Sequence, residues 1–295
     1  MKVLNFGSLN IDYVYTVDHM VAAGETLASS GMNVFCGGKG LNQSIALARA
    51  GAPVFHAGMI GPEGGVLLDA CRESGVDTRF IRMVEEKSGH TIIQVDRSGQ
   101  NCILLYGGAN RAVSQAFAEG VLDFFEAGDV LLLQNEISCL DVIIDRAYEK
   151  QMTIVLNPSP YDGNLDACDL HKVSLFLLNE IEGQQLTGER EPDVILSRIR
   201  QMYPQAETAL TLGGDGSIYQ DRQGRQYRQP VYPVKAVDTT AAGDTFTGYF
   251  LAAAVSGAPA QERLAIAAKA AAIAVSREGA SASIPTREEV LQAAF

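Results

Sequence analysis

The stretch Asp238-Thr239-Thr240-Ala241-Ala242-Gly243-Asp244-Thr245-Phe246 is followed by apolar residues at helical spacing, so it reads as a loop that runs into a helix. Three residues at this junction have little or no side chain, which lets their backbone N–H groups approach a ligand: Ala241, Ala242 and Gly243. The start of a helix attracts anions through its unpaired N–H groups and its dipole. The stretch therefore predicts an anion site.

Asp244 is the unexpected residue at this site. A carboxylate repels a bound anion, so its presence suggests a chemical task, such as accepting a proton from a nucleophile. The alternative is an acidic residue that only stabilises the first turn of the helix. The stretch alone supports both interpretations equally.

A second stretch, Gly37-Gly38-Lys39-Gly40-Leu41-Asn42-Gln43, also runs into a helix, for which Gly51 is a suitable C-terminal stop. Together the two stretches resemble the signature motifs of the ribokinase-like (PfkB) carbohydrate kinases. That family has Gly-Gly-Lys-Gly-x-Asn near its N-terminus and Asp-Thr-x-Ala-Ala-Gly-Asp-Thr-Phe near its C-terminus. The resemblance covers essentially the whole chain, with the motifs in the same order and at similar spacing, and it is strongest to the ribokinase branch.

The remaining pattern alternates short apolar runs with amphipathic segments. Strands are expected at residues 2–6, 54–59, 130–134, 153–156, 175–178 and 208–212, and further helices at residues 65–74, 115–126, 139–150 and 261–276. This alternation predicts an α/β fold, a three-layer αβα sandwich with a central, mostly parallel sheet. We expect one domain over residues 1–295.

Two strand-like regions break this rhythm. Residues 13–34 are irregular, and residues 90–96 and 102–106 form a hairpin pattern around Arg97-Ser98-Gly99-Gln100. They predict a small β lid from about 11–36 and 89–107. The resemblance implies the same lid, and it implies that the lids of two subunits pair in a homodimer.

Composition excludes several classes of protein. A net charge of −12 argues against a nucleic-acid or anionic-membrane partner, and no apolar run has the length of a membrane span. Five scattered cysteines without a C-x-x-C pair suggest neither a zinc site nor a disulfide framework, and four histidines lack metal-ligand spacing. We expect a cytoplasmic protein. Neither a P-loop nor a G-x-G-x-x-G motif occurs.

Candidate sugar ligands follow two strands. Asn10 and Asp12 are two residues apart, so on an extended chain they point the same way; the alternative is an Asx-type turn. Glu136 comes after a buried run, at the strand end where open α/β sheets bind ligands. The resemblance implies sugar contacts from these residues and from three of the N-terminal motif: Gly38, Lys39 and Asn42.

Candidate nucleotide ligands lie in the second half of the chain. The resemblance implies that Asn179 and Glu182 set magnesium and phosphates through water, although Asn and Glu three apart at a helix start also fit a capping box. It implies that Thr211, Gly213, Gly216 and Gly243 lie along ATP; a plain hairpin turn at residues 213–217 is the alternative.

A monovalent cation, K⁺, is also implied by the resemblance. Its ligands by position would be Asp238, Thr240, Ala274, Arg277, Gly279 and Ser283. Without the resemblance, residues 274–283 would be interpreted as a helix C-cap.

The predicted function is that of an ATP-dependent sugar kinase in which Asp244 accepts the proton of a primary hydroxyl. The resemblance implies that the sugar is D-ribose. The alternatives are a related kinase for a nucleoside, ketohexose or sugar phosphate, and a non-catalytic sugar-binding regulator. Four residues depart from the family pattern. Leu41, Ser44 and Tyr106, the last expected near the sugar, leave the shape of the sugar pocket open, and Ala268 stands where the family often has a polar residue near the adenine.

Overall fold

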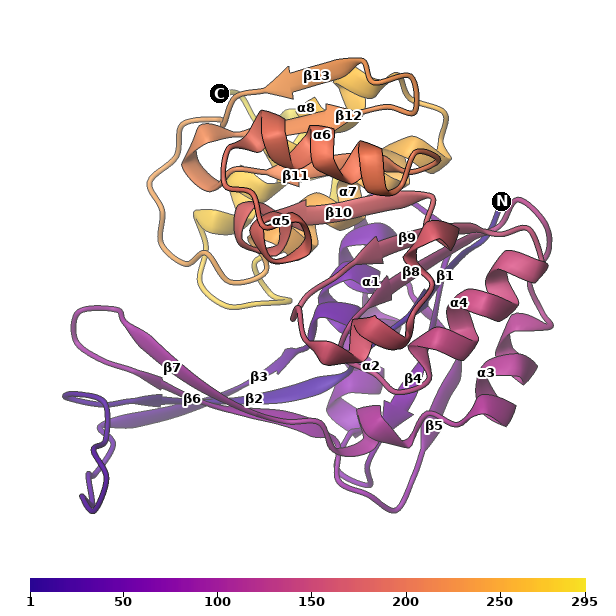
Figure 1. The fold of residues 1–295 in the computed structure, drawn as a ribbon. Coiled ribbons are helices and arrows are strands. Elements are labelled where there is room, and N and C mark those ends of the chain that lie inside the picture. The colour runs from indigo at the N-terminus through magenta and orange to yellow at the C-terminus, as the bar shows by residue number, and fades with distance from the viewer.

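The computed structural model describes all 295 residues and is built around a nine-stranded sheet (Figure 1). Its strand order is β13-β12-β11-β10-β9-β8-β1-β4-β5, and all neighbours from β5 to β11 are parallel. β12 and β13 add an antiparallel edge. The bounds are β1 Val3–Phe6, β4 Val54–Ile60, β5 Asp77–Met83, β8 Val130–Gln134, β9 Thr153–Asn157, β10 Leu175–Asn179, β11 Glu207–Thr211, β12 Ser217–Gln220 and β13 Gln226–Gln229.

Helices cover both faces of this sheet, because its central strands are apolar on both sides. Along β8, Leu131 and Leu133 belong to one core and Val130 and Leu132 to the other. The first core packs against α3 Gln115–Leu122, α4 Leu140–Glu149, α5 Glu180–Thr187 and α6 Pro192–Met202. The second packs against α1 Lys39–Arg49, α2 Gly65–Glu73, α7 Ala242–Val255, α8 Ala260–Val275 and α9 Arg287–Gln292. The expected three-layer sandwich is confirmed.

A separate four-stranded sheet, here called the lid sheet, extends away from this body (Figure 1). It consists of β2 Asn10–Thr16, β3 Gly31–Gly37, β6 Gly89–Val95 and β7 Asn101–Tyr106, in the order β3-β2-β6-β7. β2–β3 and β6–β7 are antiparallel pairs, joined by a parallel β2–β6 pairing. The predicted small sheet is thus present, while its role as a lid and the single-domain interpretation stay predictions.

Some elements differ from the expectation. α3 ends at Leu122 rather than near residue 126, because the Asp129 carboxylate accepts hydrogen bonds from the N–H groups of Glu126 and Lys2 and closes a turn there. β5, α6, β13 and α9 were not predicted. None of the helices combines the length and apolar character needed to cross a membrane.

Candidate active site

The site forms where the starts of α1 and α7 meet. The two helices approach closely at Gly248 of α7, where an added Cβ would lie 2.3 Å from the Cβ of Ala46 on α1. The start of α1 is equally close to the β1–β2 loop, since a Cβ on Gly40 would lie 2.3 Å from the backbone N of Ser8. This packing brings the two motifs found in the sequence together, as expected.

The carboxylate of Asp244 is buried and held by two side-chain amides of α1. Asn42 Nδ2 donates to Oδ2 over 3.0 Å, and Gln43 Nε2 donates to Oδ1 over 2.9 Å. The two donors hold both oxygens of this carboxylate in one orientation in the first turn of α7. The site therefore holds a fixed proton acceptor.

Backbone N–H groups at the start of α7 point to an anion. Ala241, the N-cap, has a left-handed backbone with φ 59°, and the N–H groups of Ala241, Gly243 and Asp244 make no hydrogen bond within the protein. The N–H of Ala242 differs, because it donates to the carbonyl of Thr239 over 3.3 Å. Two of the three amides predicted to bind the anion, those of Ala241 and Gly243, are therefore free. The amide of Asp244 is free as well.

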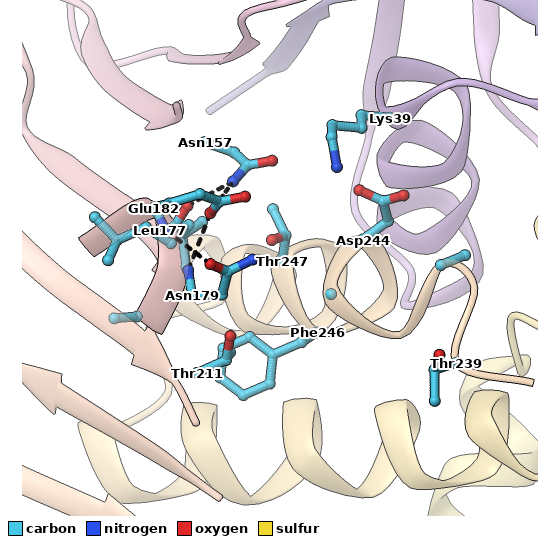
Figure 2. Close-up of a pocket in the computed structure, with 14 residues that line it drawn as sticks. Lys39, Asn157, Leu177, Asn179, Glu182, Thr211, Thr239, Asp244, Phe246 and Thr247 are labelled. Atoms are coloured by element: carbon cyan, nitrogen blue, oxygen red, sulfur yellow. Dashed lines mark hydrogen bonds between the residues drawn. The ribbon is translucent and has the colours of Figure 1, made fainter. Parts of the chain in front are cut away.

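A cavity of about 220 Å³ lies in front of these amides. Lys39 and Asp244 lie on one side of it and Asn157, Asn179 and Glu182 on the other (Figure 2). Burial lowers the pKa of the Lys39 ammonium, but the carboxylates of Asp244, Glu136 and Glu182 outweigh burial and raise it above its usual value. Lys39 is therefore a cation at neutral pH, in a place where phosphate charge can be balanced.

Asn179 and Glu182 form the capping box at the start of α5. Glu182 Oε2 accepts from the Asn179 backbone N–H over 3.0 Å and from Asn157 Nδ2 over 3.4 Å. Both residues also line the cavity. They therefore cap α5 and also lie where a role beside magnesium and phosphates would require them.

A second cavity of about 450 Å³ continues from the first, sharing Thr211, Thr239, Gly243 and Phe246 with it. Its lining is mostly apolar beyond Gly213 and Gly216 and includes Ala268 of α8. Every residue predicted along the nucleotide lines one of the two cavities: Asn179, Glu182, Thr211, Gly213, Gly216 and Gly243.

Asn10 and Asp12 lie on β2 with their side chains on the same face, as predicted. Asn110 Nδ2 donates to Asn10 Oδ1 over 2.7 Å, and Thr91 Oγ1 donates to Asp12 Oδ1 over 2.6 Å. Neighbouring strands carry glycine beside both: a Cβ on Gly37 would lie 1.9 Å from Asp12 Oδ2. Burial raises the pKa of Asp12 to about 6, against the hydrogen bond from Thr91.

Glu136 lies beside the start of α1. Its Oε2 accepts from the Lys39 backbone N–H over 3.1 Å and from the hydroxyl of Ser8. Burial raises the pKa of this carboxyl, while the charge of Lys39 opposes the shift. Gly38, with φ 92°, provides the left-handed backbone that starts α1.

The residues predicted for a monovalent cation lie in two loops tied to each other. Asp238 accepts from the N–H of Thr240 over 2.8 Å and from that of Gly279 over 3.0 Å. The carbonyl of Ala274 accepts from the N–H of Arg277, whose guanidinium binds Glu289. In a separate turn, the Ser283 hydroxyl donates to the Ala280 carbonyl.

Two of the four departures from the family pattern lie away from the cavities. Leu41 is fully buried in the core around α1. Ser44 binds Asn5 and His56.

Tyr106, expected near the sugar, is paired with His90 on the opposite face of the lid sheet from Asp12, where its hydroxyl donates to Glu86. This corrects the expectation. Side chains alternate between the two faces of a strand, so the face of Tyr106 depends on how β7 pairs with its neighbour, which the sequence of one strand does not give.

Sequence reasoning missed several polar residues of the site, among them Gln43, Asn110 and Asn157. Asn157 is the last residue of the buried strand β9, and the carboxyl end of a strand is the same signal that identified Glu136. Gln43 was within a quoted motif without a role, and nothing in the sequence marked Asn110.

Comparisons with known proteins agree with this geometry. The model of the pfkB family carbohydrate kinases matches residues 1–287. The ribokinase of Haemophilus influenzae is 34% identical, over 97% of this chain and 96% of that protein. The ribokinase of Cryptococcus neoformans var. grubii in complex with ADP superposes with a TM-score of 0.87 at 30% identity, covering 99% of both chains. The Arabidopsis thaliana ribokinase complexed with ribose and ATP gives 0.86 at 28%, covering 99% of this chain and 97% of that one.

Proposed function

Because the chain belongs to the pfkB family of carbohydrate kinases, we propose that it transfers the γ-phosphoryl group of ATP to a primary hydroxyl of D-ribose, giving ribose 5-phosphate. It is a phosphotransferase with an alcohol group as acceptor. One observation carries the proposal: a buried, doubly hydrogen-bonded carboxylate, Asp244, lies at the free amides of α7 in a cavity that continues into an apolar one. The Arabidopsis relative, solved with ribose and ATP, supports the substrates.

We assign the sugar to polar groups around the start of α1: Asn10, Asp12, Gly38, Lys39, Asn42, Glu136 and Asp244. Asn42 Oδ1 supports this assignment, because it is buried and has no hydrogen-bond partner in the protein. Such an atom is costly unless a ligand or water donates to it. A site that hydrogen-bonds hydroxyls rejects analogues lacking them far more strongly than an apolar pocket does.

The proposed chemistry is mostly positioning and charge stabilisation. Asp244 accepts the proton as the sugar hydroxyl attacks the γ-phosphorus, and ADP leaves. The free N–H groups of Ala241, Gly243 and Asp244 and the ammonium of Lys39 balance the charge on the transferred group. Closure of the lid sheet would exclude water that otherwise hydrolyses ATP.

Magnesium, when bound with the nucleotide, would neutralise phosphate charge. Asn179 and Glu182 fit a role beside it through water, because they present oxygen ligands at the cavity wall and Glu182 Oε1 accepts no hydrogen bond within the protein. The adenine would occupy the second cavity, where Ala268 offers an apolar contact and no hydrogen bond.

A potassium ion would fit the two loops tied by Asp238, using that carboxylate and backbone oxygens of Thr240, Ala274, Arg277, Gly279 and Ser283. Hard oxygen donors of this kind suit such a cation. A cytoplasmic location is proposed as well, supported by the five free cysteines.

The lid sheet supports a homodimer. Large apolar side chains are exposed on both of its faces: Ile103 and Leu105 share the face of Asp12, while Val34 and Leu104 occupy the other. Exposed apolar surface of this kind marks an interaction site.

The test is ADP release by the purified protein with MgATP, over D-ribose, 2-deoxyribose, fructose, tagatose 6-phosphate, adenosine and uridine, with and without potassium. Selective turnover of D-ribose that potassium enhances is expected. Turnover of another acceptor alone would replace ribose by that substrate. Calorimetric sugar binding without any turnover would instead identify a sugar-binding regulator.

A further inference from the structure

A chain of buried polar side chains runs beneath the active site, and Gln43 is its central member. Gln134 Nε2 donates to Asn5 Oδ1 over 3.0 Å and to Gln43 Oε1 over 2.6 Å. Gln43 Nε2 then donates to Asp244 Oδ1 over 2.9 Å and to Asn157 Oδ1 over 3.2 Å. Asn5, Gln43 and Gln134 are fully buried, and Gln43 lines neither cavity.

The orientation of each amide in this chain is fixed by groups that can only accept. Asn5 Nδ2 donates to the Gly40 carbonyl, which forces its Oδ1 to face Gln134. Asn157 Nδ2 donates to the Leu177 carbonyl, which forces its Oδ1 to face Gln43. Gln43 must then present its NH₂ group to Asp244, because a flipped amide would place its oxygen against the oxygens of Asp244 and Asn157 and its NH₂ group against that of Gln134.

Gln43 also connects the two sides of the cavity. Asn157 donates to Glu182 Oε2 over 3.4 Å, so the Asp244 and Glu182 carboxylates are joined through Gln43 and Asn157. Asn42 also binds Asp244, but it borders the proposed sugar site and Gln43 does not. The role of Gln43 can therefore be tested separately from sugar binding.

We propose that Gln43 is a positioning residue that fixes the direction of the Asp244 carboxylate for proton transfer. The proposal rests on the function proposed above, in which Asp244 is the base. Loss of the hydrogen bond lets the carboxylate rotate away from the attacking hydroxyl, and, because the bond is made to the charged form, its loss also favours the protonated form at acidic pH. The other charged groups facing Asp244 are Lys39, Glu136 and Glu182.

The test compares Gln43→Met and Gln43→Glu with Ser44→Ala. Methionine keeps the size of the side chain without its amide, and glutamate keeps the shape but places a second carboxyl beside Asp244. Ser44→Ala is the matched control, because Ser44 is the next residue of α1 and belongs to the same polar chain through Asn5 without contacting Asp244. All three changes disturb buried hydrogen bonds, so thermal stability should fall in each.

Two readouts separate positioning from a merely structural role. For Gln43→Met we expect kcat to fall about 10- to 100-fold, the range for one hydrogen bond to a charged group, with the sugar KM changed by less than about 3-fold. The acidic limb of the pH–kcat profile should move up by about one unit or more in Gln43→Met and further in Gln43→Glu. Ser44→Ala should leave kcat and the profile close to wild type.

The second readout does not need turnover. A ¹³C NMR titration of the aspartate carboxyls, with the Asp244 signal assigned by its loss in Asp244→Asn, should show the pKa of Asp244 raised in both Gln43 variants and unchanged in Ser44→Ala. An unchanged pKa in Gln43→Met, or equal shifts in that variant and Ser44→Ala, would overturn the proposal. A wild type that phosphorylates no sugar would remove the proposed function, while the titration still decides whether Gln43 controls the carboxylate.

Discussion

Asp244 combines burial, two amide donors and the first turn of a helix, an arrangement that holds its carboxylate in place as a proton acceptor. We expect Asp244→Asn to lower kcat at least about 10²-fold, the lower range for loss of a general base, because the isosteric amide has no basic oxygen. Steady-state ADP release measures this. Asp69→Asn, at an exposed carboxylate of α2, is the control and should retain full turnover. Near wild-type turnover in Asp244→Asn would remove Asp244 from the mechanism.

Asp12 predicts a pH-dependent stability. Its pKa is about 6 in the folded chain against an ordinary 3.8, so folding disfavours its ionised form. The loss of folding stability that comes from ionising Asp12 is absent below about pH 4 and grows as pH rises through 6. It reaches up to about 3 kcal/mol, or less where water still reaches the carboxylate. Asp12→Asn should therefore be more stable than wild type at pH 8, with the difference shrinking toward pH 4.5, and should bind ribose more weakly.

Urea unfolding of both proteins at the two pH values measures the stability difference. A difference that is the same at pH 4.5 and pH 8 would contradict a raised pKa for Asp12.

Single residues were predictable where a motif names them, as with Gly243, Asp244 and Asn42. The partners of those residues were not, because they come from distant parts of the chain: Gln43 and Asp244 are separated by 201 positions. No local pattern reports which amide packs against which carboxylate.

At the scale of elements, the site depends on the close approach of α1 and α7. We expect Gly248→Ala to lower the free energy of unfolding by about 1–3 kcal/mol, since its methyl group would overlap Ala46. Gly120→Ala in α3 is the matched control, because nothing lies within 4 Å of an added Cβ there. That change should be neutral or stabilising by up to about 1 kcal/mol. Equal effects of the two substitutions, measured by urea unfolding, would show that the α1–α7 contact is not tight.

Elements were predictable in proportion to their burial. β8 and β10 are continuous apolar runs, and both were predicted within one residue. β5 was missed because it lies at the sheet edge and alternates charged with apolar residues, and the four-residue β13 is polar. α6 did carry a signal that was not used, a proline at its first position with Ile195, Leu196 and Ile199 at helical spacing.

For the whole molecule, the lid sheet predicts association. Wild type should have twice the 31.5 kDa chain mass by light scattering, because apolar side chains on both faces of the sheet need cover. The double variant Ile103→Asp, Leu104→Asp puts one charge on each face, at side chains 56% and 67% exposed in the single chain, and should be monomeric and folded. Leu291→Asp, 63% exposed on α9, should leave the mass unchanged. A monomeric wild type would refute the homodimer.

The overall architecture was predictable because alternating strands and helices allow few arrangements. The order of the lid sheet was not. Its two hairpins are local, but the parallel β2–β6 pairing that joins them connects residues about eighty positions apart, and hairpin patterns carry no information on such a pairing.

The chain of amides under the active site also sets an order of events during synthesis on the ribosome. Gln43 emerges early, whereas Asp244 follows 201 residues later, which at about 5–20 residues per second is a delay of about 10–40 s. β1 likewise lacks its β8 neighbour until residue 130 has left the exit tunnel. A nascent polypeptide therefore holds the sugar-side half of the site well before it holds the base, and phosphoryl transfer begins only after the C-terminal helices have docked.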